Sequence, residues 1–443
     1  MQRRDFIRKA GLASAGAITM PYILPSGRLF AATGNRKVDH VVFCLFAGGV
    51  RSLESVQFAE GNLMRALFTG NAPVSNDIAA YLDPLPTLPL SNPLQQSGTL
   101  FRQFKYKEGP TGHYNGHTTA ITGTYTETDL SIKDHPKTPT IFEYYRKHNS
   151  PSLAAKKCWW VSNSLGPYPA LNYSSYPGYG ALYGANFIAP TWLFASDARS
   201  VMGNLRNFNS AEQNHINRMQ NFMDNNFNRN FINQDAGIYN DPTDMSDINL
   251  FINQMLVESG NGTIWNAMNA GNSMNNDMVN VVFAEKIIQR YLPELLVVNM
   301  TGVDVCHTNF TEYCNNLTKA DFAVAHLWKT IQNTPGMANN TVMIVAPEHG
   351  RNLNGNSNVD QNGRNALDHT ASTNGNGDQT ARDIFCMVVG PPNVVAQNQV
   401  INTVAGDSIE IVPTIASLLG FEQAIPPGLL KPYNTCDMQA AFI

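Results

Sequence analysis

Five short apolar runs constrain the fold of this chain more than any other feature. They stand well apart, and each is too continuous for a strand with one face in water, which would alternate apolar and polar residues. Runs of this length suit strands of a sheet that is covered on both faces. The runs are HVVFCLF at 40–46, CWWVSN at 158–163, LLVVNM at 295–300, TVMIVA at 341–346 and IFCMVVG at 384–390.

Helical patterns lie between these runs. Val324, Leu327, Trp328 and Ile331 recur at the i, i+3, i+4, i+7 spacing that gives a helix one apolar face, and residues 409–419 also have a helical pattern. Alternating strands and helices predict an α/β fold built on a doubly wound, mostly parallel sheet.

The composition changes between residues 202 and 281. This segment is rich in Asn, yet it keeps Phe, Met, Ile and Leu at helical spacing, which predicts a helical insertion or cap rather than a disordered tract. A chain of 443 residues can hold one large α/β domain with an insertion, or two ordinary domains. We expect one α/β domain over 33–443 that carries the insertion.

The N-terminal segment, MQRRDFIRKAGLASAGAITMPYILPSGRLFAATG, has the features of an export signal. Arg3 and Arg4 precede Phe6, a weakly apolar run rich in Gly and Ala follows, and small residues stand at 31 and 32. This pattern predicts a twin-arginine (Tat) signal peptide over 1–32 and a periplasmic or secreted protein. Because no later run approaches the roughly 18 apolar residues that span a membrane, we expect no transmembrane segment in the mature chain.

Charge patterning argues against a nucleic-acid partner. Charged residues make up 14% of the chain and the formal net charge is −4, whereas about 25% charged residues is usual. No basic stripe is present, so the electrostatic footprint of a nucleic-acid-binding protein is missing from the sequence.

Potential metal ligands follow three of the predicted elements in quick succession. Asp304 and His307 come after LLVVNM, Glu348 and His349 come after TVMIVA, and Asp368-His369 follows in a loop rich in Asn and Gly. Loops at the carboxyl ends of parallel strands converge, so these side chains are expected to meet. Carboxylate oxygens and imidazole nitrogens suit Zn, Mn or a similar divalent ion.

Four segments together resemble the alkaline phosphatase and sulfatase superfamily of metal-dependent hydrolases. They match its pattern in order along the chain, over roughly residues 37–165 and 295–422. A nearer resemblance is to the Tat-exported "domain of unknown function 1501" family, which has Glu-Phe-Gly-Arg and then Gly-x-Asp-His where this chain has Glu348-His349-Gly350-Arg351 and Asp368-His369. The four segments are TPTIFEYYRKHN (138–149), DVCH (304–307), ADFAVAHLWKTIQNTPGMANNTVMIVAPEHGRN (320–352) and DSIEIVPTIASLLGF (407–421).

The resemblance implies a site for one or two divalent metal ions. Asp304, His307 and His369 fall on the first metal position, and Glu348 and His349 fall on the second. The implied substrate is a small anionic ester, a phosphate or a sulfate. Arg351 and Arg364 could bind such an anion bidentately, or they could pair with carboxylates.

Two departures from the superfamily concern catalysis. Ala47 stands where the first metal-binding Asp is expected, and Ala has no donor. Counting back from Thr122-Gly123 sets His113 at the place of the nucleophile, where Thr, Ser or Cys would be usual. An imidazole there could accept a phosphoryl group, act as a general base or bind metal. The sequence therefore predicts a metal-dependent ester hydrolase in which a water held by the metal or His113 attacks, or alternatively a non-catalytic binding or assembly protein on the same fold.

Overall fold

The computed structural model describes residues 35–126, 135–149, 155–163, 171–191, 238–371 and 378–443, together with single helical positions at 211, 214, 215 and 218. The predicted export signal over 1–32 lies outside the described residues. So does nearly all of 202–237, the first part of the predicted insertion.

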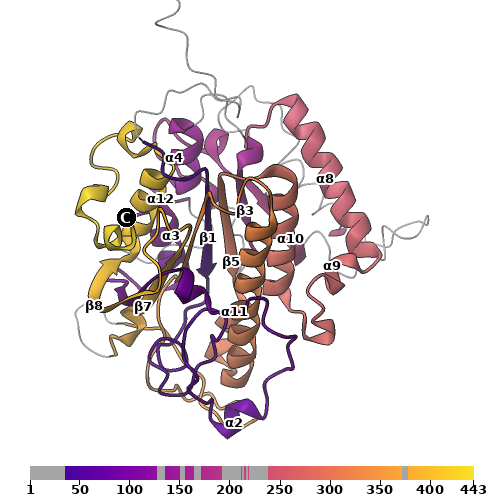
Figure 1. The fold of residues 1–443 in the computed structure, drawn as a ribbon, viewed down its shortest axis with the longest axis vertical. Coiled ribbons are helices and arrows are strands. Elements are labelled where there is room, and N and C mark those ends of the chain that lie inside the picture. The colour runs from indigo at the N-terminus through magenta and orange to yellow at the C-terminus, as the bar shows by residue number, and fades with distance from the viewer. Residues whose placement is uncertain are drawn as a thin grey trace, which may run out of the picture.

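An eight-stranded sheet forms the centre of the molecule, with strand order β4-β3-β5-β1-β6-β7-β2-β8 (Figure 1). Only β7 runs against the others, since it pairs antiparallel with both β6 and β2 while the other pairs are parallel. The predicted mostly parallel α/β sheet is thus confirmed, and all five apolar runs are strands. The strands are β1 His40–Phe46, β2 Gly98–Lys105, β3 Cys158–Val161, β4 Asn186–Ile188, β5 Leu295–Met300, β6 Thr341–Pro347, β7 Asp383–Val389 and β8 Gln399–Asp407.

Two adjacent tryptophans in β3 show why the apolar runs are continuous. Side chains alternate between the faces of a strand, so Trp159 packs on Tyr291 of one helical layer and Trp160 packs on Phe142 of the other, with ring centroids 5.1 and 5.6 Å apart. Both tryptophans are wholly buried. Burying about 200 Å² of each contributes on the order of 5 kcal/mol to the free energy of folding.

The helices form two layers, one on each side of the sheet (Figure 1). One layer holds α10 and the 24-residue α11, with α8 beside them, and the other holds α3, α4 and α12. None of the described helices combines the length and apolarity needed to cross a membrane. The bounds are α3 His113–Thr122, α4 Ile141–His148, α8 Pro242–Gly260, α10 Asn276–Tyr291, α11 Phe310–Asn333 and α12 Ile411–Leu418, with the four-residue α2 Asn76–Ala79 and α9 Thr263–Asn266.

The described part of the Asn-rich segment packs on the sheet through α8. Asp241 caps this helix by accepting from the backbone N–H groups of Thr243 and Asp244, and Pro242 occupies its first turn. Phe251 of α8 then packs on Trp159, with ring centroids 6.0 Å apart. The limits 202–281 for the insertion and 33–443 for the domain stay predictions.

A buried carboxylate fixes the loop that leaves β5. Asp277, in the first turn of α10, accepts hydrogen bonds from the backbone N–H groups of Thr301 (2.7 Å) and Gly302 (3.1 Å). The short 3-10 helix η7, Gly302–His307, starts there and carries Asp304 and His307. The loop after β6, with Glu348 and His349, leaves the same edge of the sheet because β5 and β6 both run parallel to β1.

Candidate metal centre

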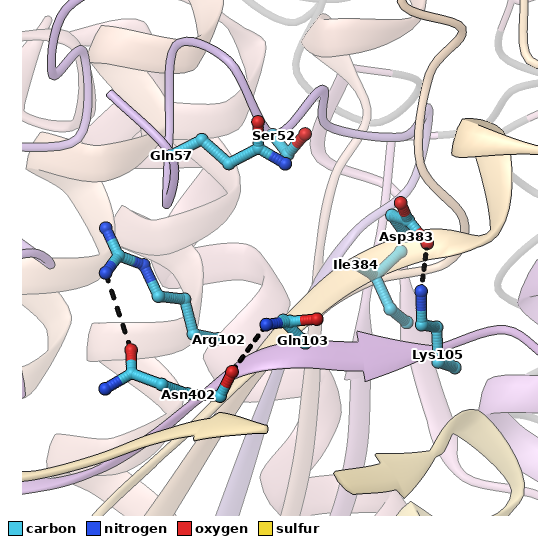
Figure 2. A pocket seen from close by; sticks show the side chains of 8 residues that line it. All are labelled: Ser52, Gln57, Arg102, Gln103, Lys105, Asp383, Ile384 and Asn402. Carbon is cyan, nitrogen blue, oxygen red and sulfur yellow. Dashed lines mark hydrogen bonds and ion pairs between the residues drawn. The ribbon is translucent and has the colours of Figure 1, made fainter. Parts of the chain in front are cut away.

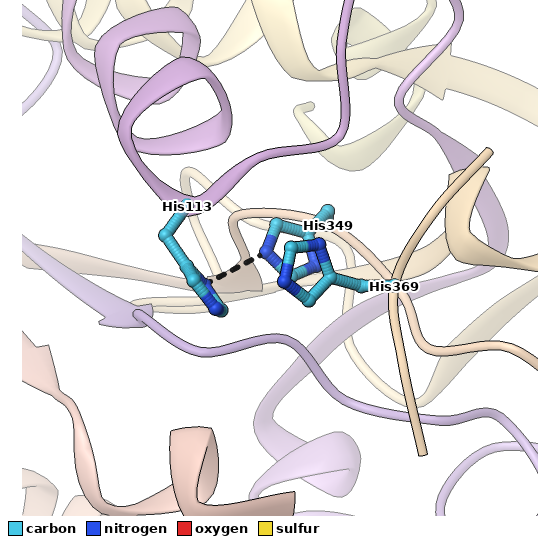
Figure 3. A group of neighbouring side chains, drawn as sticks. All are labelled: His113, His349 and His369. Atoms are coloured by element: carbon cyan, nitrogen blue, oxygen red, sulfur yellow. Dashed lines mark hydrogen bonds between the residues drawn. The ribbon is translucent and has the colours of Figure 1, made fainter. Parts of the chain in front are cut away.

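Six of the predicted site residues converge at this edge of the sheet. Their ligand atoms form two groups within 4.8 Å, one of His113, His349 and His369 (Figure 3), the other of His113, Asp304 and His307. Glu348 joins them through an oxygen 3.2 Å from Nε2 of His349. The sequence divided the ligands differently, with His369 beside Asp304 and His307. In the structure the His369 ring stacks on that of His349, with centroids 4.2 Å apart, and also lies 4.7 Å from that of His307.

His113 lies between the two groups and contacts both with its ring nitrogens. Its Nδ1 is 2.7 Å from Oε1 of Glu348 and 3.1 Å from Nε2 of His349. Its Nε2 is 2.6 Å from Oδ1 of Asp304 and 3.2 Å from Nε2 of His307. As the first residue of α3, His113 reaches the cluster from the layer opposite to α10 and α11.

The other three imidazoles each turn one nitrogen outward to an acceptor. Nδ1 of His349 is 2.8 Å from the carbonyl of Gly350, and Nδ1 of His369 contacts the carbonyl of Thr111. Nδ1 of His307 is 3.2 Å from the carboxylate of Asp368. Because carbonyls and carboxylates only accept, the ring proton belongs on Nδ1 in each case and the Nε2 lone pair faces the cluster. Outer partners of this kind are typical of metal-binding histidines.

Protonation states also favour cation binding. Burial lowers the pKa of His307, His349 and His369, so these imidazoles are neutral at pH 7. Burial would raise the pKa of Asp304, but its hydrogen bond with His113 and the nearby positive charges outweigh burial and lower it. Burial would likewise lower the pKa of His113, yet the hydrogen bonds with Asp304 and Glu348 raise it to about 9. His113 is therefore an imidazolium between two carboxylates when nothing else supplies positive charge.

The donor set fits a divalent metal ion. Two ligands about 2.0 to 2.1 Å from one zinc ion at a tetrahedral angle lie about 3.3 Å apart, and the His113 contacts of 3.1 and 3.2 Å with His349 and His307 match that spacing. Glu348 is wholly buried, and among the described residues its Oε2 has no hydrogen-bond partner. A buried carboxylate needs a compensating partner or charge, so a cation would also satisfy the electrostatics of Glu348.

The backbone of the loop after β1 packs directly against the cluster. A Cβ on Gly48 would lie 2.6 Å from the backbone nitrogen of Asp304, and one on Gly49 would lie 2.5 Å from Nδ1 of His349. Both glycines have positive φ values, 142° and 80°, which disfavour other residues. Ala47 is wholly buried and has no donor, so this loop supplies backbone packing where the sequence resemblance led us to expect an Asp.

The two arginines that the sequence singled out have different surroundings. Arg351 is buried, lies 3.2 Å from Oδ1 of Asp304, and donates to the carbonyls of Gly48 and Leu367. Arg364 is not brought to the cluster. Within the described ranges its charged contacts are with Glu60 and Asp77, and its guanidinium lies 4.8 Å from the ring centre of Phe310.

Several residues that support the cluster were not identified from the sequence. Asp368 was noted only as a neighbour of His369, and its contact is with His307 instead. Asn356 donates to that carboxylate (3.0 Å), and both Asn356 and Asn358 donate to the carbonyl of His307. The richness of this loop in Asn was visible in the sequence, but the partner of each side chain depends on the folded loop.

His117 lies beneath the cluster and outside both groups of ligand atoms. It is buried, its Nδ1 is 3.8 Å from Oε2 of Glu348, and its Nε2 is 3.3 Å from Nδ2 of Asn299. Burial lowers its pKa to about 4, so the ring is neutral at pH 7. His117 thus sits on the same face of α3 as His113, one turn deeper.

A pocket of about 420 Å³ lies elsewhere, over β2, β7 and β8 (Figure 2). Its lining includes none of the cluster residues. Lys105 pairs there with Asp383, and Nε of Arg102 donates to the carbonyl of Val56 at 2.7 Å. Its lining holds one carboxylate, that of Asp383, whereas the candidate ligands of the cluster come in groups of three.

Comparison with solved structures finds several similar chains at low sequence identity. The chain matches a protein of the alkaline phosphatase superfamily from Vibrio parahaemolyticus (10% identity, 96% of this chain and 79% of that one, TM-score 0.43). It matches wild-type alkaline phosphatase PafA (10% identity, 91% and 100%, TM-score 0.47) and the PsFucS1 sulfatase from Pseudoalteromonas sp. (10% identity, 96% and 73%, TM-score 0.40).

The chain itself has a mostly parallel α/β sheet with helices on both faces. No protein-family model matches the chain, and no curated protein matches its sequence. The narrower resemblance to the "domain of unknown function 1501" family stays a prediction, and the similarity to solved structures concerns the fold.

Proposed function

We propose that this chain is an exported metal-binding hydrolase that cleaves phosphate or sulfate esters. The observation that carries the proposal is the convergence of three neutral imidazoles, two carboxylates and His113 on one small volume. Export rests on the twin-arginine pattern of residues 1–32, and the ester class rests on the resemblance of the sequence segments.

Charge and exposure in the cluster suit such a reaction. A divalent ion held by these residues supplies positive charge that stabilises the anionic transition state of ester hydrolysis. The two carboxylates, Asp304 and Glu348, provide the negative charge that attracts the cation. The side chains of Asp304 and His307 are 26% and 34% exposed while that of Glu348 is 0% exposed, so a substrate would approach from the side of Asp304 and His307.

A second candidate function is a non-catalytic binding or assembly protein that keeps a metal for stability. The observation that favours it is the loop after β1, where Ala47 has no donor and Gly48 and Gly49 leave no room for one. His113 in place of a hydroxyl or thiol nucleophile points the same way. Both candidates require a bound metal, so they differ only in turnover.

The test measures metal content and turnover on the same purified protein. Metal is counted by elemental analysis after dialysis, and hydrolysis of an aryl phosphate and an aryl sulfate is followed with Asp304→Ala for comparison. The hydrolase proposal expects bound metal, turnover in the wild type, and at least a 100-fold lower rate in the variant because a ligand and a charge are lost. His326→Ala is the matched control. His326 lies far along α11, where it pairs with Glu285 of α10.

Each outcome separates the two candidates. Bound metal without turnover of either ester would contradict the hydrolase proposal and support the non-catalytic binding protein. A wild type that holds no metal after reconstitution with zinc would overturn both. Equal turnover in the wild type and Asp304→Ala would remove the cluster from the reaction.

A further inference from the structure

We infer that the pocket over β2, β7 and β8 binds a small hydroxylated molecule that carries a single acid group. This site goes beyond the proposed function, because a carboxylic acid is not an ester and no residue of the cluster lines the pocket. The side chain that points most directly to an anionic ligand is Arg102.

Arg102 lines the pocket as a cation without a carboxylate partner. Its Nε donates to the carbonyl of Val56 at 2.7 Å, and its Nη1 lies 3.5 Å from Oδ1 of Asn402. Its guanidinium carbon lies 5.5 Å from the ring centre of Phe58. All three groups are neutral, and none of the acidic side chains that the structure describes pairs with Arg102. The guanidinium therefore remains available for an oxyanion, which it can bind through two parallel N–H donors.

The charge of the lining sets the charge of the ligand. Arg102 and Lys105 are its two cations, and Asp383, which pairs with Lys105, is its one carboxylate. The lining thus keeps one positive charge, although the chain as a whole carries a formal charge of −4. A singly charged acid group neutralises this charge, whereas a phosphate dianion would leave an excess of negative charge beside Asp383.

The rest of the lining favours a ligand with hydroxyl groups. It consists of the side-chain amides of Gln57, Gln103 and Asn402, the hydroxyl of Ser52, and Ile384, which is the one apolar member among the described residues. Amides and hydroxyls both donate and accept hydrogen bonds, as the hydroxyl groups of a ligand do. An aliphatic or aromatic acid would cover these polar groups without pairing them, which is unfavourable. The volume of about 420 Å³ lies near the small end of the range for ligand pockets, about 300 to 1,000 Å³, so the ligand is a small molecule.

An irregularity in β2 places these polar groups on one wall. Arg102 and Lys105 stand at opposite ends of the pocket with Gln103 between them (Figure 2). Successive residues of a regular strand point to opposite faces, so Arg102 and Gln103 would not normally line the same pocket. The register of β2 against β8 shifts between Phe101 and Gln103 and again between Gln103 and Lys105. Such bulges re-aim side chains and are frequent beside functional sites.

The pocket is separate from the cluster, but both are built on the same segment of backbone. Gly350, which follows His349, donates its N–H to the carbonyl of Ala381 just before β7. Val50, in the loop that leads to the opposite wall, donates to the carbonyl of His349 at 3.3 Å. No side chain of this shared segment lines the pocket, so substitutions can remove one site and leave the other in place.

Isothermal titration calorimetry of the full chain with glucuronate tests the inference. Glucuronate carries one carboxylate and several hydroxyl groups, and because it is not an ester, turnover cannot interfere. The titration is done in buffer without divalent metal. We expect saturable binding of one glucuronate per chain and about 10-fold or more weaker binding of glucose, its neutral counterpart.

Four variants locate the site. Arg102→Gln keeps a polar side chain but removes the charge, and it should weaken glucuronate binding about 10-fold or more. Arg102→Lys keeps the charge without the two parallel donors and should lose less, which separates the loss of charge from a folding defect. Arg65→Gln is the matched control, since Arg65 is exposed and does not line the pocket. Asp304→Ala removes a ligand of the cluster and should bind glucuronate as the wild type does.

Every outcome supports or overturns the site. Weaker binding in Arg102→Gln, with unchanged binding in Arg65→Gln and Asp304→Ala, supports it. Unchanged binding in Arg102→Gln, or a loss in Asp304→Ala, overturns it and leaves the proposed metal-binding function standing. A wild type that binds glucuronate no more tightly than glucose, or not at all, overturns it as well.

Discussion

The carboxylate of Asp368 lies 3.2 Å from Nδ1 of His307, while Nε2 of the same ring faces His113. This contact fixes the tautomer and the orientation of His307, and Asn356 holds the carboxylate in turn with a 3.0 Å hydrogen bond. Removing such an outer partner typically costs 10- to 100-fold in metal affinity. We therefore expect Asp368→Ala to weaken zinc binding by about 10-fold or more, measured by competition with a chromophoric chelator.

The control for this prediction is Asp383→Ala, because Asp383 is also partly exposed and ion-paired, but with Lys105 in the pocket over β2. Its zinc affinity should match that of the wild type. Unchanged affinity in Asp368→Ala would mean that the ring of His307 is oriented by its packing alone.

Gly49→Ala should destabilise the protein and disturb the cluster together. The added Cβ would lie 2.5 Å from Nδ1 of His349 and 3.0 Å from the carbonyl of Gly350, at a φ of 80°. Gly428→Ala is the matched control, since its φ is 87° but nothing lies within 4 Å of the added Cβ. Backbone strain is common to both variants, so their difference reports the clash. We expect the unfolding free energy of Gly49→Ala to be roughly 2 kcal/mol lower than that of Gly428→Ala, as measured by urea denaturation. Equal losses would show that the neighbouring loop moves aside.

The fold was predictable where burial on both faces makes a strand apolar throughout. That rule found the five strands β1, β3, β5, β6 and β7, but it carries no information on strand direction, so the antiparallel β7 was not foreseen. The missed strands break the rule for physical reasons. β2 carries polar Arg102 and Gln103 at a register shift, β8 is an edge strand exposed over much of its length, and β4 has three residues.

The sequence was enough to predict which residues meet at the candidate site. Ligand-type residues after successive parallel strands must lie at one edge of the sheet, and the structure brings Asp304, His307, Glu348 and His349 together there. The pairing of individual atoms depends on loop conformation and could not be derived. Arg351 and Arg364 stand in the same short segment, yet one is buried against Asp304 and the other pairs at the surface.

This difference predicts losses of stability of different size for two matched substitutions. Arg351→Ala removes a buried guanidinium that contacts Asp304 and two backbone carbonyls, and breaking a buried ion pair costs about 3 to 5 kcal/mol. Arg364→Ala removes partly exposed ion pairs with Glu60 and Asp77, which contribute about 1 kcal/mol or less. Urea denaturation of both variants measures the contrast. A loss in Arg364→Ala as large as in Arg351→Ala would refute this division.

The buried carboxyl group of Asp321 should make stability depend on pH. Its two oxygens accept from the backbone N–H groups of Ala66 (2.8 Å) and Leu67 (2.9 Å), and burial outweighs these bonds and raises its pKa to about 8. An unfolded Asp titrates near a pKa of about 3.9, so between these values the folded protein binds more protons than the unfolded chain. The stabilisation from this group is complete below about pH 4 and is lost as the pH rises through about 8.

The unfolding free energy of the wild type should therefore fall from pH 5 to pH 8, with Asp321 contributing a slope of at most about 1.4 kcal/mol per pH unit. Asp277, whose pKa burial raises to about 7, adds to the fall in the same direction. Asp321→Asn cannot titrate, so its profile should be shallower over this range. Urea denaturation of the wild type and of Asp321→Asn at pH 5, 6, 7 and 8 gives the two slopes. A profile of Asp321→Asn as steep as that of the wild type would mean that the two backbone N–H groups keep this carboxylate ionised in the folded protein.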